Sequence, residues 1–210
     1  MLEGQKCLVI GSGISGIGAV ALLEKYHADV VLYDSSDKLT KEDLEAKLPG
    51  ESKAVCIAGE LPEEVELSIQ AAVLSPGVPT DIPLVNRMRD RGVQILGEIE
   101  LGFLAEQGRV IAITGTNGKT TTTTLTGEIM KAHFGAEKTF VVGNIGNPYT
   151  LEVTKTSKDS VTVGEISSFQ LETIHTFHPV VSAILNITPD HLNRHHTMEA
   201  YVAAKEAVAS

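Results

Sequence analysis

The stretch "IAITGTNGKTTTTTLTGEIM", residues 111–130, places an apolar run before a glycine-containing loop and a threonine-rich helix. Strand, loop and helix in this order form the phosphate-binding loop of many α/β proteins. The usual pattern requires Gly, four residues and then Gly-Lys-Ser/Thr. Gly118, Lys119 and Thr120 match its end, whereas Ile113 occupies the position of the first Gly. The stretch is therefore either a variant nucleotide loop or a threonine-rich helix start that contains Gly-Lys-Thr by coincidence.

The chemistry of the loop favours a nucleoside triphosphate. Successive backbone N–H groups from Gly115 to Gly118 can form an anion nest, and the dipole of the following helix adds positive potential. Lys119 would place its ammonium on the terminal phosphates, and the hydroxyl of Thr120 would bind Mg²⁺. The β-branched residues that follow are poor helix formers, but early helix positions tolerate them.

Composition narrows the class of protein. The chain has 210 residues, 42% of them hydrophobic and 4% aromatic, with 19 glycines and a net charge of -10. This balance is typical of α/β proteins. We find no basic cluster that would indicate nucleic-acid binding. Cys7 and Cys56 lie in apolar runs and are expected to be buried thiols. The first apolar run is too short for a signal peptide, and no stretch approaches a membrane span, so we expect a cytoplasmic protein.

Short apolar runs alternate with helical patterns along the whole chain, which predicts open parallel sheets of βαβ units. The runs expected to be buried strands are residues 7–10, 29–33, 54–58, 71–75, 93–96, 109–114, 140–143, 160–166 and 180–187. Helices are expected at 15–27, 41–48, 83–92, 98–106 and from 119 onward. We place a domain boundary near Gly97, giving domains 1–96 and 97–210. Residues 198–210 predict a helix with no stop signal, from which we expect a truncated chain.

A second glycine loop lies near the start of the chain. Gly11, Gly13 and Gly16 stand in G-x-G-x-x-G order, directly after a strand and at the start of a helix. The next strand ends in Asp34, where an acidic residue meets a ribose hydroxyl in dinucleotide-binding folds. Taken alone, this loop favours an NAD-dependent oxidoreductase over a merely structural tight turn.

Two further segments supply groups that a nucleotide site needs. Glu165 ends an apolar strand, where a carboxylate is costly unless it meets a cation such as Mg²⁺. Another strand leads through Pro189 into Asp190 and His191. These two residues are either further groups of the nucleotide site or, with equal weight, a helix cap and a surface histidine. A zinc site from His191, His195 and His196 is conceivable, but no cysteine or carboxylate completes a familiar spacing.

Four blocks of the sequence together resemble the bacterial Mur ligase family. They are "TGTNGKTTT", "GNIGNP" (143–148), "EISSFQLE" (165–172) and "NITPDHLNRH" (186–195), in the order in which that family carries them. The family's ATP loop departs from the standard pattern in the same way as residues 113–120. The block "EISSFQLE" favours the branch that adds D-glutamate. The resemblance covers the whole chain but about half of the family's three-domain length, so the third domain is expected to be absent.

The resemblance implies a Rossmann-like domain that binds a uridine nucleotide rather than NAD, followed by an incomplete ATP-binding α/β domain of the P-loop type. It implies that Ser15, Asp34, Ser75 and Gly77 lie near the UDP moiety, and that Asn144 and Ser167 face the muramoyl-alanine end. Lys119 would grip the ATP phosphates, while Thr120 and Glu165 would bind one Mg²⁺. The implied ATP site comprises Gly115, Thr116, Asn117, Gly118, Lys119, Thr120 and Thr121.

The family also implies a second Mg²⁺, bound by His191 and by a carbamylated lysine that aligns with Lys205. Lys119, His191 and Lys205 are therefore the expected catalytic residues. In this chain we expect Lys205 to be unmodified, because its helix ends soon afterwards and would lack the packing that desolvates it. The sequence departs from the family where Ser35 and Ser36 follow Asp34, since some members carry an arginine there, and where Asn193 replaces an aspartate.

The reaction implied by the resemblance is phosphoryl transfer followed by amide formation, in peptidoglycan precursor synthesis. The alanyl carboxylate of UDP-N-acetylmuramoyl-L-alanine attacks the γ-phosphate of ATP, and the amine of D-glutamate then attacks the resulting acyl phosphate. Such chemistry depends on positioning and charge neutralisation. We expect a monomer that binds these three substrates and Mg²⁺ and that binds neither nucleic acid nor a membrane. Without the third domain, we expect that it cannot ligate D-glutamate. A non-catalytic nucleotide-binding module remains an alternative.

Overall fold

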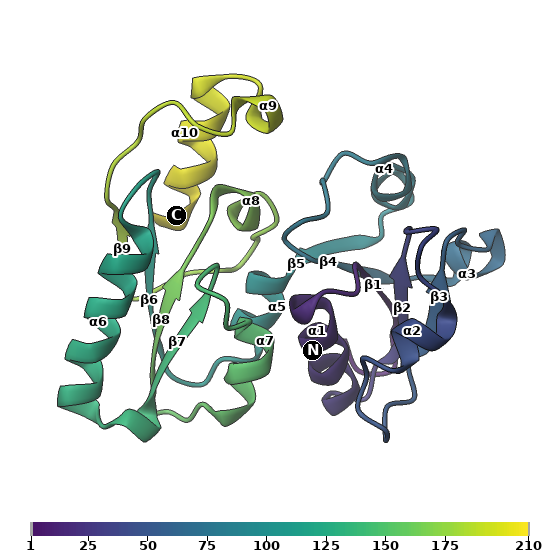
Figure 1. Ribbon diagram of the computed structural model, residues 1–210, viewed down its shortest axis with the longest axis horizontal. Helices are drawn as coiled ribbons and strands as arrows, with labels where there is room; N and C mark the ends of the chain where they lie inside the picture. Colours follow the sequence, from purple (N-terminus) through teal and green to yellow (C-terminus); the bar gives the residue numbers. More distant parts are fainter. Residues whose placement is uncertain (1, 210) are drawn as a thin grey trace.

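The computed structural model describes residues 2–209 and contains two parallel sheets side by side (Figure 1). The first sheet has the order β3-β2-β1-β4-β5, with all neighbouring strands parallel. Its strands are β1 (Lys6–Ile10), β2 (Asp29–Asp34), β3 (Val55–Ala58), β4 (Ala71–Leu74) and β5 (Gln94–Gly97). The strand order reverses between β1 and β4, and ligands of doubly wound sheets bind beyond the carboxyl ends of strands at such a point.

Helices cover both faces of this first sheet because successive strand residues point to opposite sides. Cys7, Val9 and Leu32 join the core on the side of α1, whereas Leu8 and Val31 join the core on the side of α4. The helices are α1 (Ile14–Lys25), α2 (Lys41–Glu45), α3 (Glu63–Ser68), α4 (Pro83–Asp90) and α5 (Glu98–Ala105). Both predicted thiols, Cys7 and Cys56, are free and buried.

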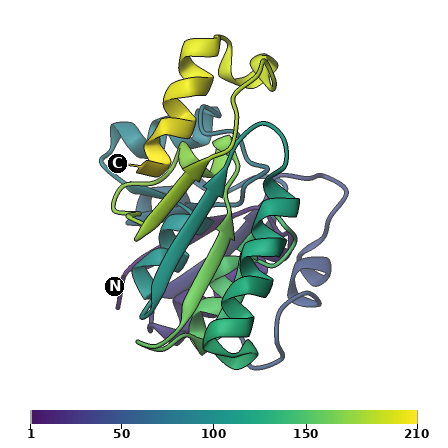
Figure 2. The same cartoon turned by 90° about the vertical axis from the view of Figure 1, so that its left-hand side faces the viewer.

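The second sheet has the order β7-β8-β6-β9 and is also parallel throughout. Its strands are β6 (Arg109–Thr114), β7 (Thr139–Gly143), β8 (Val161–Glu165) and β9 (Val181–Ile184). Helix α6 (Lys119–Phe134) covers one face, as Figure 2 shows, and α5 and α7 (Tyr149–Glu152) lie on the side of the first sheet. The remaining helices are α8 (Ser168–Leu171), α9 (Leu192–His195) and α10 (Met198–Glu206), with 3₁₀ turns at Ala136–Lys138, Val153–Lys155 and Ala207–Ala209.

The predicted α/β class is confirmed, and each expected strand is present with ends shifted by a few residues. The prediction of a buried strand over 180–187 is wrong in length and in burial. β9 is an edge strand, and the side chain of Val181 is 53% exposed. The expected helix over 198–210 is also shorter, because α10 ends at Glu206 and a 3₁₀ turn follows.

Within residues 2–209, no helix combines the length and the apolar character needed to cross a bilayer.

Candidate functional site

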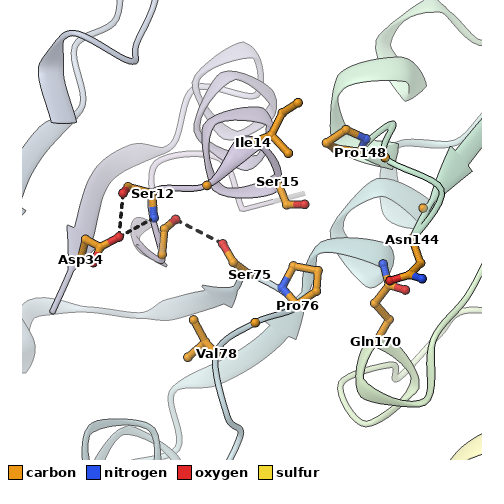
Figure 3. Close-up of a pocket in the computed structure, with 15 residues that line it drawn as sticks. Ser12, Ile14, Ser15, Asp34, Ser75, Pro76, Val78, Asn144, Pro148 and Gln170 are labelled. Atoms are coloured by element: carbon orange, nitrogen blue, oxygen red, sulfur yellow. Dashed lines mark hydrogen bonds between the residues drawn. The ribbon is translucent and has the colours of Figure 1, made fainter. Parts of the chain in front are cut away.

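A pocket of about 440 Å³ lies between the two sheets, at the carboxyl ends of β1 and β4 (Figure 3). The loop after β1 and the loop after β4 form one wall, and the loop after β7 forms the other. Five of the six residues expected at a uridine-nucleotide substrate line it together: Ser15, Asp34, Ser75, Gly77 and Asn144. The lining also includes Gly11, Ser12, Gly13, Ile14, Pro76, Val78, Gly143, Gly146, Pro148 and Gln170.

The glycine loop after β1 is tight because two of its glycines cannot carry a side chain. Gly11 has φ 99°, a conformation that side chains disfavour. A Cβ on Gly16 would overlap the carbonyl oxygen of Gly11. The hydroxyl of Ser75 in β4's loop donates to that same carbonyl at 3.2 Å. The loop therefore turns closely against β4 and presents the start of α1 to the pocket.

Asp34 fixes this loop from the end of β2. One of its oxygens, Oδ2, accepts from the backbone N of Ser12 at 2.9 Å and from the Ser12 hydroxyl at 2.6 Å. Its other oxygen accepts from the backbone N of Ser36 at 3.1 Å. Burial acts to raise the pKa of Asp34, but the Ser12 and Ser36 bonds and the charge of Lys47 outweigh it and hold the pKa below its ordinary value. Asp34 is thus a carboxylate engaged with the protein as well as facing the pocket.

The phosphate-type loop lies at the carboxyl end of β6. Gly115 and Gly118 have φ 148° and 82°, so the loop requires glycine at both positions. Asn117 is held by Asn186, because each residue donates one hydrogen bond of 2.9 Å to the other. The Lys119 ammonium folds back and donates to the carbonyls of Gly115 and Thr116, at 2.9 Å each. Thr120 and Thr121 lie in the first turn of α6 and are exposed.

Helix α10 lies over this loop and contacts it with two side chains. The Tyr201 hydroxyl lies 3.0 Å from the hydroxyl of Thr116, and the Lys205 ammonium donates to the Gly115 carbonyl at 2.9 Å. The Lys205 nitrogen also lies 4.7 Å from the centroid of the Tyr201 ring. Lys119 and Lys205 therefore share one carbonyl acceptor.

The expectation that Lys205 lacks desolvating packing is wrong. Its side chain is 1% exposed, because α10 packs against the loop and the end of β6. Burial, reinforced by the charge of Lys119, lowers the pKa of Lys205 to about 8. The 3₁₀ turn after α10 contributes Val208, which is fully buried, so the helix end is packed despite its short length.

Glu165 joins the pocket to the phosphate-type loop. It ends β8 opposite Ile113 of β6, and is 1% exposed. Its Oε1 accepts from the side-chain amide of Asn144 at 2.9 Å, and Asn144 lines the pocket. Its Oε2 is buried and has no hydrogen-bond partner among the described residues. An unpaired buried carboxylate oxygen is costly without a cation, so this atom fits the metal-binding role expected from the sequence.

The donor set around Glu165 suits Mg²⁺ better than a metal held entirely by protein. No group of three or more His, Cys, Asp or Glu side chains within residues 2–209 is placed to hold an ion. Mg²⁺ is commonly bound by one or two carboxylates together with substrate phosphates and water. The single carboxylate of Glu165, with its unpaired Oε2, corresponds to that arrangement.

His191 and Ser167 lie at the periphery of this region. His191 is exposed, adopts φ 52°, and its ring centroid lies 4.9 Å from that of Phe169. Ser167 caps α8 by accepting from the backbone N of Gln170 at 3.3 Å, and it does not itself line the pocket. Asp190 accepts from the backbone N of His191, the next residue, at 2.9 Å. This is a hydrogen bond within a local turn, and it does not cap a helix.

His195 is a residue that the sequence offered only as a zinc ligand. Its side chain is buried, with Nε2 at 2.9 Å from the Ser168 hydroxyl and Nδ1 at 3.3 Å from a Glu172 oxygen. Its ring stacks on Phe169 and contacts Tyr201. His195 thus connects the segment after β8 with the helix that covers the phosphate-type loop. Burial lowers its pKa, although the charge of Glu172 acts in the opposite direction.

Lys47, Gln170 and Tyr201 border the sites without having been expected from sequence. Gln170 has a local signal, since Ser167 and Gln170 form a capping box three residues apart. Tyr201 stands four residues before Lys205, a spacing that places both on one helix face. Lys47 has no such signal, because its contact with Ser12 depends on how the segment between β2 and β3 folds.

Comparisons with known proteins agree with this arrangement. The family model described as "Mur ligase MurD-like, N-terminal domain" matches residues 5–97, and that described as "Mur ligase middle domain" matches residues 113–210. A Mur ligase structure, the UDP-N-acetylmuramate:L-alanyl-gamma-D-glutamyl-meso-diaminopimelate ligase from Neisseria meningitides, superposes with a TM-score of 0.60 at 15% identity. That match covers 97% of this chain and 67% of the other chain, and it shows a shared fold.

Curated relatives are considerably more similar in sequence. A UDP-N-acetylmuramoylalanine--D-glutamate ligase of Lachnospira eligens is 58% identical over 208 residues, which cover 99% of this chain and 46% of the relative. The protein of the same name from Clostridioides difficile is 46% identical, over 97% of this chain and 45% of the relative. The chain thus spans about half the length of the curated relatives it matches. From both family matches and these identities, the chain belongs to the Mur ligase family.

Proposed function

We propose that this chain supplies the UDP-substrate pocket and the ATP loop of a ligase that adds D-glutamate to UDP-N-acetylmuramoyl-L-alanine in peptidoglycan synthesis. The observation that carries the proposal is Glu165, whose carboxylate is bonded to the pocket residue Asn144 and stands beside the phosphate-type loop. A substrate carboxylate in the pocket could thereby approach a phosphate on the loop. The names of the relatives at 58% and 46% identity support this choice within the family.

The interdomain pocket is proposed to hold the nucleotide-linked substrate. The start of α1 and the backbone of the glycine loop favour the diphosphate, because a helix N-terminus presents free N–H groups and positive potential. Ser15, Asp34, Ser75 and Gly77 would contact the UDP portion. Asn144 and Ser167, on the side of the second sheet, would lie toward the muramoyl-alanine portion. The proposed boundary between domains 1–96 and 97–210 runs through this pocket.

The phosphate-type loop is proposed to hold ATP through residues 115–121. Backbone N–H groups and the α6 N-terminus would cradle the phosphates. Lys119 now donates to two loop carbonyls, and its ammonium would exchange these for oxygens of the terminal phosphates. Thr120 and Glu165 would hold Mg²⁺, and His191 with a carbamylated Lys205 would hold a second ion. When bound, these ions neutralise charge on the phosphate oxygens.

The residues of the chain would act mainly by positioning and by neutralising charge. Asn144 would orient the alanyl carboxylate toward the γ-phosphate, and bond formation from that carboxylate oxygen to phosphorus would release ADP. Lys119 would stabilise the negative charge on the transferring group. The amine of D-glutamate would then attack the acyl phosphate and expel phosphate. Groups that bind D-glutamate are proposed to lie in the additional length of the relatives.

The glycine loop alone favours an NAD-dependent oxidoreductase. That hypothesis leaves Lys119, Glu165 and Lys205 without a role. Calorimetric titration of the chain with UDP-N-acetylmuramoyl-L-alanine, ATP with Mg²⁺, and NADH separates the two functions. We expect binding of the first two and none of the third. Binding of NADH without a response to the UDP substrate would refute the proposal.

The chain alone is expected to bind substrates without completing the ligation. The relatives are about twice as long, and a closing element that excludes water is needed for efficient transfer. Phosphate release that depends on D-glutamate, measured with residues 1–210, would contradict this expectation.

We further propose a cytoplasmic monomer, since ATP and nucleotide-linked precursors are cytoplasmic substrates. Analytical ultracentrifugation tests the oligomeric state.

A further inference from the structure

The interdomain pocket has an unusual charge balance for a site that would hold a diphosphate. Among its lining residues, Asp34 is the one with an ionisable side chain, and no lysine or arginine is included. A carboxylate alone would repel a nucleoside diphosphate. Backbone N–H groups and the α1 N-terminus offset part of that repulsion. A cation from outside the lining would offset more of it.

Lys47 brings such a cation to the rim of the pocket. It follows α2 in the chain and is exposed, yet its ammonium donates to the Ser12 hydroxyl at 2.9 Å and to the Ser12 carbonyl at 3.3 Å. Ser12 lines the pocket. An ammonium has three N–H donors, so one of them has no acceptor within residues 2–209. The side chain is therefore held at the glycine loop by two hydrogen bonds, and one N–H of its ammonium is free to donate to a ligand.

The same contact couples Lys47 electrostatically to Asp34. The Ser12 hydroxyl accepts from Lys47 and donates to Asp34 Oδ2 at 2.6 Å, so cation, hydroxyl and carboxylate form a continuous chain. The negative charge of Asp34 is thereby compensated before a ligand arrives. A phosphate beside Ser12 would meet the ammonium rather than an uncompensated carboxylate.

The position of Lys47 is set by the local structure that precedes it. Thr40 and Asp43 form a capping box that fixes the start of α2. Leu44 of α2 is fully buried and anchors the helix to the core below the glycine loop. The residues directly after Asp34 are serines, so the segment closest to the pocket offers hydroxyls and no cation. Lys47 provides the charge from farther along the chain.

We propose that Lys47 is a phosphate-binding residue of the interdomain pocket, which donates its third N–H to the diphosphate of a bound uridine nucleotide. The inference rests on the proposed function, because it presupposes a UDP-type ligand there. It assigns Lys47 direct contact with the ligand, beyond its contact with Ser12.

The test compares UDP with uridine in wild type and three variants. Lys47→Met removes the ammonium but keeps the aliphatic stem, and Lys47→Arg keeps the charge. Lys41→Met is the matched control, because Lys41 lies at the start of α2, the helix that precedes Lys47, and forms an exposed ion pair with Glu45 instead. UDP binding is measured by calorimetry, and uridine binding by NMR chemical-shift titration.

We expect Lys47→Met to weaken UDP binding by about tenfold or more, as loss of a hydrogen bond between charged groups does. Uridine affinity should stay within about twofold, Lys47→Arg should recover most of the UDP affinity, and Lys41→Met should match wild type. Salt should weaken UDP binding less in Lys47→Met than in wild type.

Three results would overturn the inference. Equal UDP affinity in Lys47→Met and Lys41→Met would show that Lys47 does not reach the phosphates. Equal losses for UDP and uridine would show that Lys47 only holds the glycine loop in shape. Failure of wild type to bind UDP, together with binding of NADH, would overturn the proposed function and this inference together, and is distinguished from the other two by the wild-type titration.

Discussion

At the scale of single residues, the phosphate-type loop is organised by two lysines that converge on the carbonyl of Gly115. Lys119 and Lys205 each donate to that oxygen at 2.9 Å. The carbonyl oxygen has two lone pairs and can accept both bonds, but the mutual repulsion of the two ammonium groups disfavours two charges at this place. A triphosphate at the loop would relieve the repulsion by supplying anionic acceptors. The loop is thus arranged to gain from binding an anion.

Removing the Lys119 ammonium tests its role at the phosphates. We expect Lys119→Ala to weaken binding of ATP with Mg²⁺ by about tenfold to a hundredfold, the range for one charged hydrogen bond. The control is Lys131→Ala, because Lys131 lies in the last turn of α6 and pairs with Glu128 at 2.8 Å. Calorimetry measures both affinities. Equal affinity in the two variants would show that the Gly-Lys-Thr sequence is coincidental.

The proximity of the two lysines also predicts a titration that depends on both. The pKa of Lys205 is lowered to about 8, by burial first and by the charge of Lys119 second. We expect the ¹³Cε resonance of Lys205, assigned by its loss in Lys205→Met, to titrate near pH 8. In Lys119→Ala the midpoint should move upward, because a repelling charge is gone. Lys131→Ala should leave it unchanged, and an unmoved midpoint in Lys119→Ala would refute the coupling.

At the scale of elements, the apolar runs predicted the strands well because a parallel strand covered on both faces must be apolar throughout. The helices α3, α7, α8 and α9 were not predicted, since four to six residues are too few for a 3.6-residue period to show. The burial of Lys205 and the contact of Lys47 with Ser12 also escaped prediction. Both depend on how distant segments fold over a loop, which local patterns do not encode.

An ion-paired carboxylate ties α3 to α4 on the outer side of the first sheet. Glu66 accepts from Arg87 at 2.6 Å and from Arg91 at 2.8 Å, and is nearly buried. The Arg87 hydrogen bonds lower the pKa of Glu66 from 4.5 to about 2, against an opposing effect of burial and with further help from Arg91. The folded chain therefore holds this carboxylate charged at a pH where the unfolded chain protonates it.

The sign of the pH effect follows from that lowered pKa. Because the folded-state value lies below the unfolded one, the stabilisation by Glu66 is complete above about pH 4.5 and is lost as the pH falls toward 2. We expect Glu66→Gln to be less stable than wild type at pH 6, and the difference to shrink steadily between pH 4.5 and 2. Urea unfolding across this range measures it. A difference that is constant with pH would contradict the assignment.

At the scale of the whole molecule, one hydrophobic core runs through both sheets. It contains Leu23 and Val73 on the side of the first sheet and Tyr149 and Ile166 on the side of the second, with Ile99 of α5 among them. Helix α5 lies between the sheets (Figure 1). Its close contact with α7 depends on Gly102 of α5, which faces the ring of Tyr149. We expect this continuity to hold the two walls of the interdomain pocket at a fixed relative position.

That close contact predicts how the molecule unfolds. A Cβ on Gly102 would lie 2.7 Å from ring atoms of Tyr149, whose side chain is buried, so the ring or the helix would have to shift. We expect Gly102→Ala to destabilise the protein by about 1–3 kcal/mol, as overpacking does. The control is Gly50→Ala, where a Cβ meets nothing within 4 Å and the backbone needs no positive φ, so the change should be neutral or slightly stabilising.

Because the core is shared, the destabilisation should reach both sheets. We expect one calorimetric transition in wild type and one transition at a lower temperature in Gly102→Ala, with calorimetric and van't Hoff enthalpies equal in each. Hydrogen exchange should show amides of β1 and of β8 losing protection by the same amount, since both would then open in a single global event. Two separate transitions, of which Gly102→Ala moves one alone, would show that the sheets fold independently and that the pocket between them is free to open.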